Sequence, residues 1–434
     1  METSKILYSK DTLLSELKER IYLNLHRFDD PYYRIEGVFQ PADASWPGDK
    51  EGRALLAYVS HYKINGTEIP CMKQMLEKMP LYTNRALYFG QPSENVIDEQ
   101  QLSGHSWLLR GLCEHYNCFK DDFSLSALIS VTENLYLPLA GRFESYPIER
   151  KNRNGGDVSG SESEIIGSWR LSTDTGCAFM SIDGLSHVYE ITADTRVLKL
   201  LHEMLDVFSK MDKREMRLQT HCTLTAARGM LRLFEITEDR VLLDSAAEIF
   251  DLYVHGGGMS KTYQNLNWWG RPDSWTEPCA IVDSLMLAGE LYRFTGKEVY
   301  RTLASRIFVN GFASSQRENG GAGTDSLVLR GQPYLYQKMP EAFFCCSMRL
   351  AEGLYYAWNN VDMLLPRISG KLEKDDEGRY FDGDVMFGEI ESGEFAEYSQ
   401  NIYTVDGHNL VPLLKYYRIP ADKARKLRQR ILFD

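Results

Sequence analysis

Apolar residues recur three to four positions apart along most of this 434-residue chain, which is the spacing of amphipathic helices. Three segments share one pattern in detail: a helix ends near a threonine, a short polar turn follows, and a second amphipathic helix begins. The three threonines are Thr192, Thr237 and Thr295. They are spaced by about one helical hairpin plus a loop of variable length. Weaker forms of the pattern occur at 58–66 and 112–121.

Repeated hairpins of this length stack on one another, so that each buries its apolar face against its neighbours. Further candidate helices at 13–25 and 346–358 bring the number of inner helices to six or seven. This number favours a closed (α/α)6 toroid over an open solenoid. We therefore expect an all-α toroid of helical hairpins over residues 1–365 and a C-terminal extension, packed on the toroid, over 366–434. At most a small β element is expected near the C-terminus, where 380–390 alternates like a hairpin.

Two long polar segments interrupt the helical pattern. Residues 149–164 are rich in Asn, Gly and Ser, and residues 317–331 are rich in Gly. Long loops of a toroid gather at one rim and shape the site, so both segments are candidate lips of a binding site. For 149–164, a surface insertion is an equally good interpretation.

Composition narrows the class of ligand. The formal net charge is −12, and the basic residues form no block apart from a short stretch at 423–430. Nucleic acid is therefore not expected as a partner, and a neutral or cationic ligand fits better than a polyanion. Aromatic residues make up 12% of the chain, including 25 Tyr and 7 Trp. Flat aromatic faces suit carbohydrate binding, although tyrosine also packs helical cores.

The sequence as given shows no targeting signal and no candidate membrane span. Residues 1–5 lead straight into an amphipathic helix, and no apolar run approaches the roughly 18 residues that a membrane span needs. We expect a cytoplasmic protein without a membrane partner. In that reducing compartment the eight cysteines are expected to be thiols or metal ligands rather than disulfides. The oligomeric state stays open, with a homodimer as one alternative.

The strongest chemical signal is a carboxylate and three thiols. Glu277 and Cys279 flank Pro278, and the adjacent pair Cys345–Cys346 follows further along the chain. Proline favours the first turn of a helix, so Cys279 is expected at a helix N-terminus. Zn2+ accepts thiolate and carboxylate ligands in four-coordinate sites, which makes these four residues candidate zinc ligands. Spacing alone leaves the alternative open that the cysteines are small buried hydrophobic residues.

The segment 267–280, which reads Asn-Trp-Trp-Gly-Arg-Pro-Asp-Ser-Trp-Thr-Glu-Pro-Cys-Ala, resembles glycoside hydrolase family 127. The Cys345–Cys346 pair and the Glu-Gly-Leu run at 352–354 extend this resemblance to the β-L-arabinofuranosidase-like family, over about residues 180–360. The resemblance implies an (α/α)6 barrel and a zinc centre. It also implies that Cys345 is the nucleophile, forming a thioglycosyl intermediate, while Glu277, Cys279 and Cys346 hold the zinc.

One departure from the family pattern concerns the general acid. The family carries its acid/base glutamate shortly before the Glu-x-Cys motif, where this chain has 260–267 without a carboxylate. An amide cannot protonate a leaving group. Another acid, such as Asp273, Glu341 or Glu277 itself, takes the role in one interpretation, and Asp273 is our assignment. In the others, the chain has divergent chemistry, or it is a binding relative that kept the metal.

Several residues are candidates for substrate binding. The resemblance implies this role for His221 at the start of an inner helix, and the Gly-polar turn before it suggests the same for His105. The tryptophans beside the metal motif could stack on sugar rings, and Gln264 stands in the stretch where the acid is missing. For each, a capping or core role is the competing interpretation. The complete candidate set is His221, His105, Trp268, Trp269, Gln264 and Tyr336.

The sequence thus predicts a zinc-dependent retaining glycoside hydrolase that acts on a small L-arabinofuranoside-like substrate. A second interpretation is a non-catalytic carbohydrate-binding toroid whose zinc is structural. A third is another toroid sugar enzyme, of the unsaturated uronyl hydrolase or epimerase type, which would not need the four metal ligands.

Overall fold

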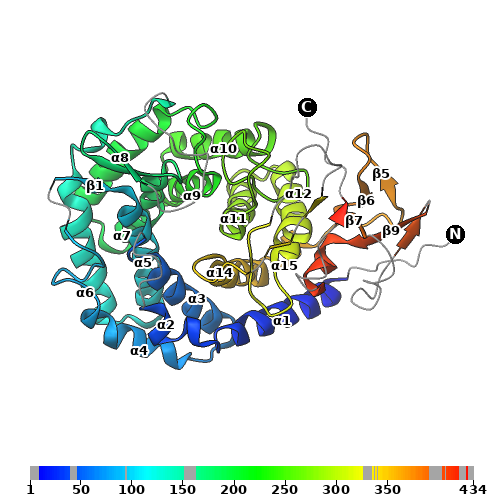
Figure 1. The fold of residues 1–434 in the computed structure, drawn as a ribbon, viewed down its shortest axis with the longest axis horizontal. Helices are drawn as coiled ribbons and strands as arrows, with labels where there is room; N and C mark the ends of the chain where they lie inside the picture. The colour runs from blue at the N-terminus through cyan, green and yellow to red at the C-terminus, as the bar shows by residue number, and fades with distance from the viewer. Residues whose placement is uncertain are drawn as a thin grey trace. The chain divides into compact units, whose positions relative to one another are not determined.

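The computed structural model places most of the chain in helices (Figure 1). It describes residues 9–39, 46–92, 95–150, 163–325, 335–336, 338–339, 341–390, 403–405, 407–419 and 427–428. The chain divides into two compact units. Unit 1 comprises Met1–Arg27, Gly257–Asn267 and Arg271–Asp434, and unit 2 comprises Phe28–Gly256 and Trp268–Gly270. The boundary expected at residue 365 stays a prediction.

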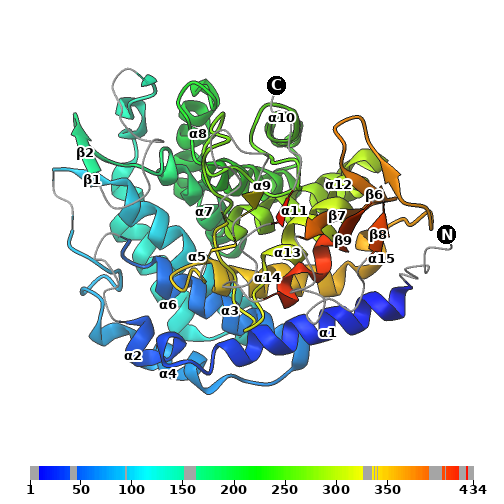
Figure 2. The ribbon, with the colours of Figure 1, turned by 45° about the vertical axis from the view of Figure 1, so that its right-hand side comes forward.

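Unit 2 is built on four helices that are buried over most of their length. They are α3 (Asp49–Asn65), α5 (Glu99–Phe119), α7 (Ser181–Thr192) and α9 (Thr220–Thr237). In this order each packs on the next, so that α5 lies between α3 and α7 (Figure 2). Helix α9, for example, is buried continuously from Thr220 to Leu231. A helix that buries all its faces must lie inside a layered fold.

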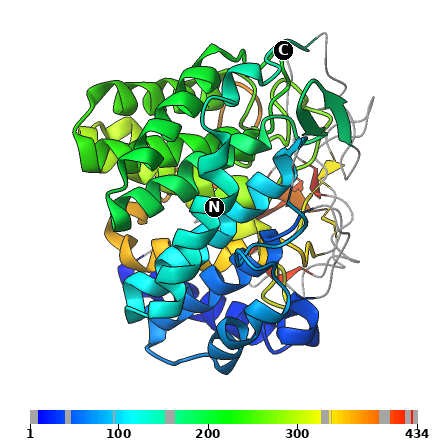
Figure 3. The same ribbon diagram turned by 90° about the vertical axis from the view of Figure 1, so that its left-hand side faces the viewer.

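A second set of helices in unit 2 buries one stripe only. Helices α6 (Asp122–Val131), α8 (Thr195–Lys210) and α10 (Arg240–His255) pack on α5, α7 and α9 respectively. Figure 3 shows the helices between residues 181 and 255, drawn in green, side by side. The buried residues of α8 recur every three or four positions: Val197, Leu200, Leu201, Met204, Val207 and Phe208. The inner and outer helices therefore alternate along the chain as helical hairpins.

The threonine turns have a common physical basis. At the end of α7 the Thr192 hydroxyl donates to the Val188 carbonyl at 2.8 Å, and Ala193 takes the left-handed conformation with φ of 51°. Asp194 then accepts the Arg196 N–H at 2.8 Å and caps α8. The threonine satisfies a free carbonyl, the left-handed residue ends the helix, and the aspartate starts the next one.

The other two turns repeat the threonine contact and the left-handed residue, and Asp239 caps α10 as Asp194 caps α8, whereas α12 begins after Lys297 without a side-chain cap. Thr237 donates to Leu233 at 2.7 Å, and Thr295 donates to Leu291 at 2.6 Å. The left-handed residues that follow are Glu238 and Gly296, with φ of 60° and 67°. The repeated turn expected from the sequence is confirmed.

Unit 1 contains α1 (Lys10–Arg27), α11 (Pro278–Thr295), α12 (Glu298–Arg306), α14 (Cys346–Asn359) and α15 (Val361–Leu364). Helix α14 packs on α11 and on α1, and both α11 and α14 are buried over most of their length. Helix α1 differs from the inner helix expected there, because it buries one stripe only, consisting of Leu13, Glu16, Leu17, Arg20, Ile21 and Asn24.

Short helical segments connect these elements. In unit 2 they are η1 (Pro31–Tyr33), α2 (Ile35–Val38), α4 (Pro70–Lys78), η2 (Met79–Leu81), η3 (Thr132–Tyr136), η4 (Leu137–Leu139), η5 (Phe143–Ser145) and η7 (Cys177–Met180). In unit 1 they are η8 (Ile307–Phe312), α13 (Ala313–Ser315) and η10 (Leu413–Arg418).

Two small sheets accompany the helices. In unit 1 the strand order is β4-β10-β7-β6-β5, and β9 pairs with both β7 and β8. The expected hairpin at 380–390 is present as β6 and β7, with Tyr380 opposite Phe387. The strands are β4 (Leu335–Tyr336), β5 (Glu373–Lys374), β6 (Tyr380–Asp382), β7 (Val385–Ile390), β8 (Tyr403–Val405), β9 (His408–Pro412) and β10 (Leu427–Arg428). In unit 2 a three-stranded sheet has the order β1-β3-β2, from Ile97–Asp98, Trp169–Ser172 and Ser163–Ile166.

Among the described residues, none of the helices combines the length and the apolar character that crossing a membrane would require.

Candidate metal centre

The first two residues of the candidate site stand at the start of α11. Glu277 is extended, with φ of −130° and ψ of 111°, and Pro278 is the first helical residue. The proline has no N–H to leave unsatisfied, so the helix begins here at little cost, and Cys279 lies in its first turn. The backbone N–H of Glu277 donates to Asn265 Oδ1 at 2.7 Å, which holds the residue that carries the carboxylate.

Backbone hydrogen bonds hold the segment before Glu277 to two other parts of the chain. The Thr276 N–H donates to the Asp325 carbonyl at 2.8 Å, and the Asp325 N–H donates to the Thr276 hydroxyl at 3.1 Å. The Asn267 N–H donates to the Trp275 carbonyl at 2.9 Å. Glu277 therefore enters α11 from a fixed position rather than from a free loop.

The other two candidate ligands stand at the start of α14. Cys345 precedes the helix and Cys346 is its first residue. The turn before them is anchored by the Glu341 carboxylate, which accepts from the side chains of Arg27 at 2.8 Å, Asn319 at 2.9 Å and Ser347 at 2.7 Å. Because Ser347 belongs to the first turn of α14, these contacts join the two ends of the turn that carries both thiols.

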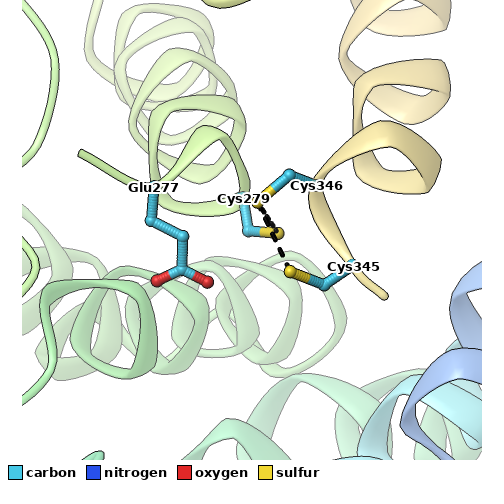
Figure 4. A group of neighbouring side chains, drawn as sticks. All are labelled: Glu277, Cys279, Cys345 and Cys346. Atoms are coloured by element: carbon cyan, nitrogen blue, oxygen red, sulfur yellow. Dashed lines mark hydrogen bonds between the residues drawn. The ribbon is translucent and has the colours of Figure 1, made fainter. Parts of the chain in front are cut away.

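The four candidate ligands meet in one place. One oxygen of Glu277 and the sulfur atoms of Cys279, Cys345 and Cys346 all lie within 4.8 Å of one another. The Cys279 and Cys346 sulfur atoms are 3.7 Å apart, and those of Cys345 and Cys346 are 3.3 Å apart (Figure 4). These separations exceed the roughly 2.05 Å of a disulfide. A zinc ion with bonds of about 2.3 Å to sulfur in a tetrahedron spaces its sulfur ligands by about 3.8 Å, so the group fits such an ion.

The electrostatics of the group also favour a cation. Hydrogen bonds with Cys279 and Cys346, together with burial, raise the pKa of the Cys345 thiol well above its ordinary value. Burial and the hydrogen bond with Cys279 raise the pKa of Cys346 in the same way. Three thiolates and a carboxylate repel one another in so small a space unless a positive ion neutralises them. Thiolates select soft or borderline ions such as zinc.

Exposure distinguishes the four ligands. Cys279 and Cys346 are 0% exposed, whereas Cys345 is 6% and Glu277 8% exposed. The thiols of Cys279 and Cys346 could hold a metal ion, but a substrate could not reach them. Cys345 and Glu277 are also buried, but they keep a small exposed surface and are the two members of the group nearest to solvent.

A buried ion pair lies one helical turn further along both helices. Arg349 of α14 donates to the Asp283 carboxylate of α11 at 2.6 Å, and both side chains are 0% exposed. Arg349 also pairs with Glu352 on its own helix. Since breaking a buried pair leaves an uncompensated charge, this contact fixes the relation between the two helices that carry the ligands.

Asp273, our assignment for the general acid, lies in a surface turn. Its carboxylate accepts from Arg271 at 2.8 and 2.9 Å and is exposed. Both oxygen atoms of the carboxylate are engaged by the guanidinium, so this geometry argues against a role as proton donor. The carboxylate of Glu341, the second candidate for the acid, already accepts the three hydrogen bonds that anchor the turn before α14. Glu277, the third candidate, belongs to the metal group.

The two candidate histidines are buried in unit 2. His105 is 0% exposed, and its Nε2 accepts the Phe89 N–H at 2.9 Å while Nδ1 lies 2.7 Å from the Gln101 carbonyl. Both ring nitrogens therefore hold backbone groups, which favours a structural role. Burial lowers the pKa of His105 to about 4, so the ring is neutral. His221 is 1% exposed and stacks on Trp107 with the ring centroids 5.5 Å apart.

The two candidate tryptophans are core residues of unit 2. Trp268 and Trp269 are 1% and 0% exposed. The Trp269 indole N–H donates to the Thr223 hydroxyl at 3.0 Å, and the Trp268 backbone bridges to Gln219. Neither ring offers a free face to a sugar. They attach the chain to the start of α9.

Gln264 is likewise buried, at 0% exposure, in unit 1. Its Oε1 accepts from the Thr262 hydroxyl at 2.9 Å, and its Nε2 donates to the Ser314 hydroxyl at 3.4 Å. These contacts order the segment that precedes the metal motif. Tyr336 lies in β4, and its side chain falls outside the described part of the structure, as do most of 149–164 and the end of 317–331.

Two residues near the ligands escaped the sequence analysis. Asn265 was not singled out because an asparagine in a polar loop is common, and only the fold brings it to Glu277. Phe344 precedes Cys345 and is 57% exposed, although apolar residues beside a buried motif are normally expected inside. Its position directly before the cysteine pair was the only available signal.

The fold is that of the α/α toroids, a class that the solved structures of several carbohydrate-active proteins share. No family model matches the sequence, and no curated protein sequence matches it. The solved structures of α/α proteins do match it. The α-mannanase of glycoside hydrolase family 76 from Bacteroides thetaiotaomicron is 11% identical, over 81% of this chain and 96% of that chain, with a TM-score of 0.51.

Two further matches are β-arabinofuranosidases of glycoside hydrolase family 127. One is 13% identical, over 90% of this chain and 66% of that chain, with a TM-score of 0.55. The other, from Geobacillus stearothermophilus T6, is 14% identical, over 88% of this chain and 69% of that chain, with a TM-score of 0.51. The chain thus spans about two thirds of the length of these proteins. At such identities the likeness concerns the fold.

Proposed function

We propose that this protein is a divergent, metal-dependent glycoside hydrolase of the family 127 type, with Cys345 as its nucleophile. The observation that carries the proposal is the group of four possible ligand atoms within 4.8 Å of one another, in which only Cys345 and Glu277 keep some exposed surface. The likeness of the fold to family 127 and the Glu-x-Cys and Cys-Cys motifs support it.

The residues have separate roles in the proposed reaction. Glu277, Cys279 and Cys346 would hold the metal ion, for which zinc fits the donor set best. When bound, zinc would keep the sulfur atoms ionised at neutral pH. The Asn265 contact to Glu277 and the Glu341 contacts before α14 would keep the ligands in register. The buried pair of Arg349 and Asp283 would prevent α11 and α14 from separating.

Two displacements at the anomeric carbon make up the reaction. The Cys345 sulfur forms a bond to this carbon while the bond from the carbon to the leaving oxygen breaks, and an acid gives that oxygen a proton. Water then attacks the same carbon and gives one proton to the group that protonated the leaving oxygen, while the carbon–sulfur bond breaks. The thiolate and the acid are both restored. Two inversions leave the anomeric configuration unchanged. An L-arabinofuranoside-like small glycoside is the substrate that we propose.

The absence of a carboxylate from 260–267 supports a second candidate, a carbohydrate-binding protein in which the metal only joins α11 and α14. This candidate predicts sugar binding without turnover. The metal group weighs against an unsaturated uronyl hydrolase or an epimerase, which would not need its ligands.

Metal analysis and a nucleophile variant test the proposal. We expect about one zinc ion per chain and activity on p-nitrophenyl β-L-arabinofuranoside. Cys345→Ala should lower kcat by at least about 10^3-fold, since removing a nucleophile abolishes the covalent route. The matched control is Cys113→Ala, which also removes a buried thiol but lies outside the metal group. A metal-free protein, or a Cys345→Ala variant as active as the control, would refute the mechanism.

A further inference from the structure

We propose that Phe344 is the sugar-stacking residue of the site, on which the apolar face of the substrate ring rests while its anomeric carbon meets Cys345. This inference rests on the proposed function and names a residue that determines its specificity. The position of Phe344 directly before Cys345 brings its backbone within about 3.8 Å, Cα to Cα, of the reactive residue.

Phe344 is unusual among the exposed apolar residues. In the described ranges, the large apolar side chains with high exposure are Tyr22, Leu81, Tyr82, Ile129, Ile165, Ile236, Val241, Val299 and Phe344. It is the one phenylalanine or tryptophan in this set. A scattered exposed aliphatic residue needs no explanation. Leaving a phenyl ring in water forgoes about 1.5–3 kcal/mol of burial, so its position needs one.

The other exposed aromatic residues have ring partners. Tyr22 makes an edge contact with His26 at 4.2 Å between centroids, and Tyr82 stacks on Phe39 at 4.5 Å. Within the described ranges, no ring contact involves Phe344. Its neighbour Phe343 is different, because it is partly buried and the Arg27 guanidinium lies 5.1 Å from its ring centre. The two adjacent phenylalanines thus divide into one that packs and one that is presented to solvent.

The turn that presents Phe344 is held in place. Glu341 is bound to Arg27 and to Ser347, at 2.8 and 2.7 Å, on either side of the turn. Ala342 and Cys345, which flank the two phenylalanines, are 5% and 6% exposed. A fixed backbone lowers the entropy that a ring loses on stacking, and a preorganised residue gains affinity in this way. Sugars offer apolar C–H faces, and aromatic stacking adds about 0.5–1.5 kcal/mol beyond burial.

The test separates binding from chemistry. Phe344→Ala should raise KM for p-nitrophenyl β-L-arabinofuranoside by about 10-fold, with kcat within about threefold and the zinc content unchanged. Phe344→Trp should keep or lower KM, because a larger ring stacks at least as well. Val299→Ala, which truncates an apolar side chain that is 56% exposed on α12, is the matched control and should change neither constant.

Other outcomes overturn the inference. A Phe344→Ala variant with unchanged KM shows that the ring does not touch substrate. A variant that loses zinc or kcat shows that the ring supports Cys345 instead. If wild type hydrolyses no glycoside, calorimetry with methyl β-L-arabinofuranoside decides. Binding that weakens about 10-fold in Phe344→Ala would sustain the stacking role while the hydrolase proposal fails, and wild type that binds no sugar would refute both.

Discussion

The backbone of Glu277 is held by one amide side chain of the preceding segment. Its N–H donates to Asn265 Oδ1 at 2.7 Å, inside a part of unit 1 where Asn265 is 0% exposed. A buried donor that loses its acceptor costs about 1–3 kcal/mol. In the proposed metal centre, Asn265 would therefore act on the ion through Glu277, as a positioning residue that contributes no ligand atom of its own.

Asn265→Ala should weaken zinc affinity by about 10- to 100-fold, which is the usual effect of removing a group that orients a ligand. Competition with a zinc chelator measures this affinity. Asn310→Ala is the control. Asn310 is also buried, and its side chain donates to the Asp384 carbonyl at 2.9 Å, but it is not part of the metal group. Both variants should lose stability, but only Asn265→Ala should lose affinity. Equal affinities in the two variants would remove the positioning role.

Individual elements are joined by the threonine turns. Each inner helix that ends in this way places one residue in the left-handed region, and the residue differs from turn to turn: Ala193, Glu238 and Gly296. A side chain in that region costs about 1–2 kcal/mol, whereas glycine adopts it freely. The chain therefore contains both the strained and the relaxed version of one turn.

Ala193→Gly should stabilise the protein by about 0.5–1 kcal/mol, and Gly296→Ala should destabilise it by about 1 kcal/mol. A Cβ at Gly296 would meet no atom within 4 Å, so conformation alone determines the effect there. Urea unfolding of the two variants, monitored by circular dichroism, measures both changes. Changes of the same sign would contradict the shared turn geometry.

Stability of the whole molecule should depend on pH through its buried titratable groups. Burial lowers the pKa of His61 to about 3, and that of His105 to about 4. Both are neutral in the folded state and must gain a proton on unfolding in acid. The stability that they contribute is complete above pH 6.5, the ordinary histidine pKa, and is lost as the pH falls from there toward 4 for His105 and toward 3 for His61.

Glu51 acts in the opposite sense. Burial raises the pKa of its carboxyl to about 7, so the folded state keeps a proton that the unfolded state releases above the ordinary value near 4.5. Its contribution is therefore lost as pH rises from 4.5 to 7. Between pH 4.5 and 6.5 His61 and His105 oppose Glu51, each changing stability by at most about 1.4 kcal/mol per pH unit. His115 and His187, whose pKa values burial also lowers, act in the same direction as these two histidines. The net effect is a loss of stability on acidification.

We expect the free energy of unfolding to fall by on the order of 1–3 kcal/mol from pH 6.5 to 4.5, with a smaller fall in His61→Gln. Urea titrations at several pH values measure this slope. His255→Gln is the matched control, since its side chain is 73% exposed. If His61→Gln and His255→Gln change the pH dependence of the free energy of unfolding equally, the buried histidines are not its cause.

Much of the fold and part of the site follow from local rules. The threonine turns, the hairpin at 380–390 and the helix starts at Pro278 and Cys346 depend on residues close together in the chain, and all were predicted. The four candidate metal ligands were predicted from the chemistry of their donor atoms and from a resemblance, and the structure brings their donor atoms within 4.8 Å of one another.

The surroundings of His105, Trp268 and Trp269 could not be predicted in the same way. Helical periodicity predicts that a side chain lies on an inner helix or next to one. Because an inner helix is buried on every side, periodicity does not show which neighbour the side chain contacts. Whether a ring then meets a ligand or another helix depends on which backbone groups the neighbouring elements bring to it. For His105 these are the Phe89 N–H and the Gln101 carbonyl.

The sequence by itself determined the helical hairpins and the set of thiol and carboxylate groups, because short-range hydrogen bonding and ligand chemistry are properties of residue types. Tertiary structure alone decided that Asp273 is paired on the surface, that Asn265 holds Glu277, and that Phe344 is exposed beside Cys345. Residue types alone do not decide these outcomes, because the path of the backbone around each residue determines which side chains meet and which stay exposed, and packing of the helices fixes that path.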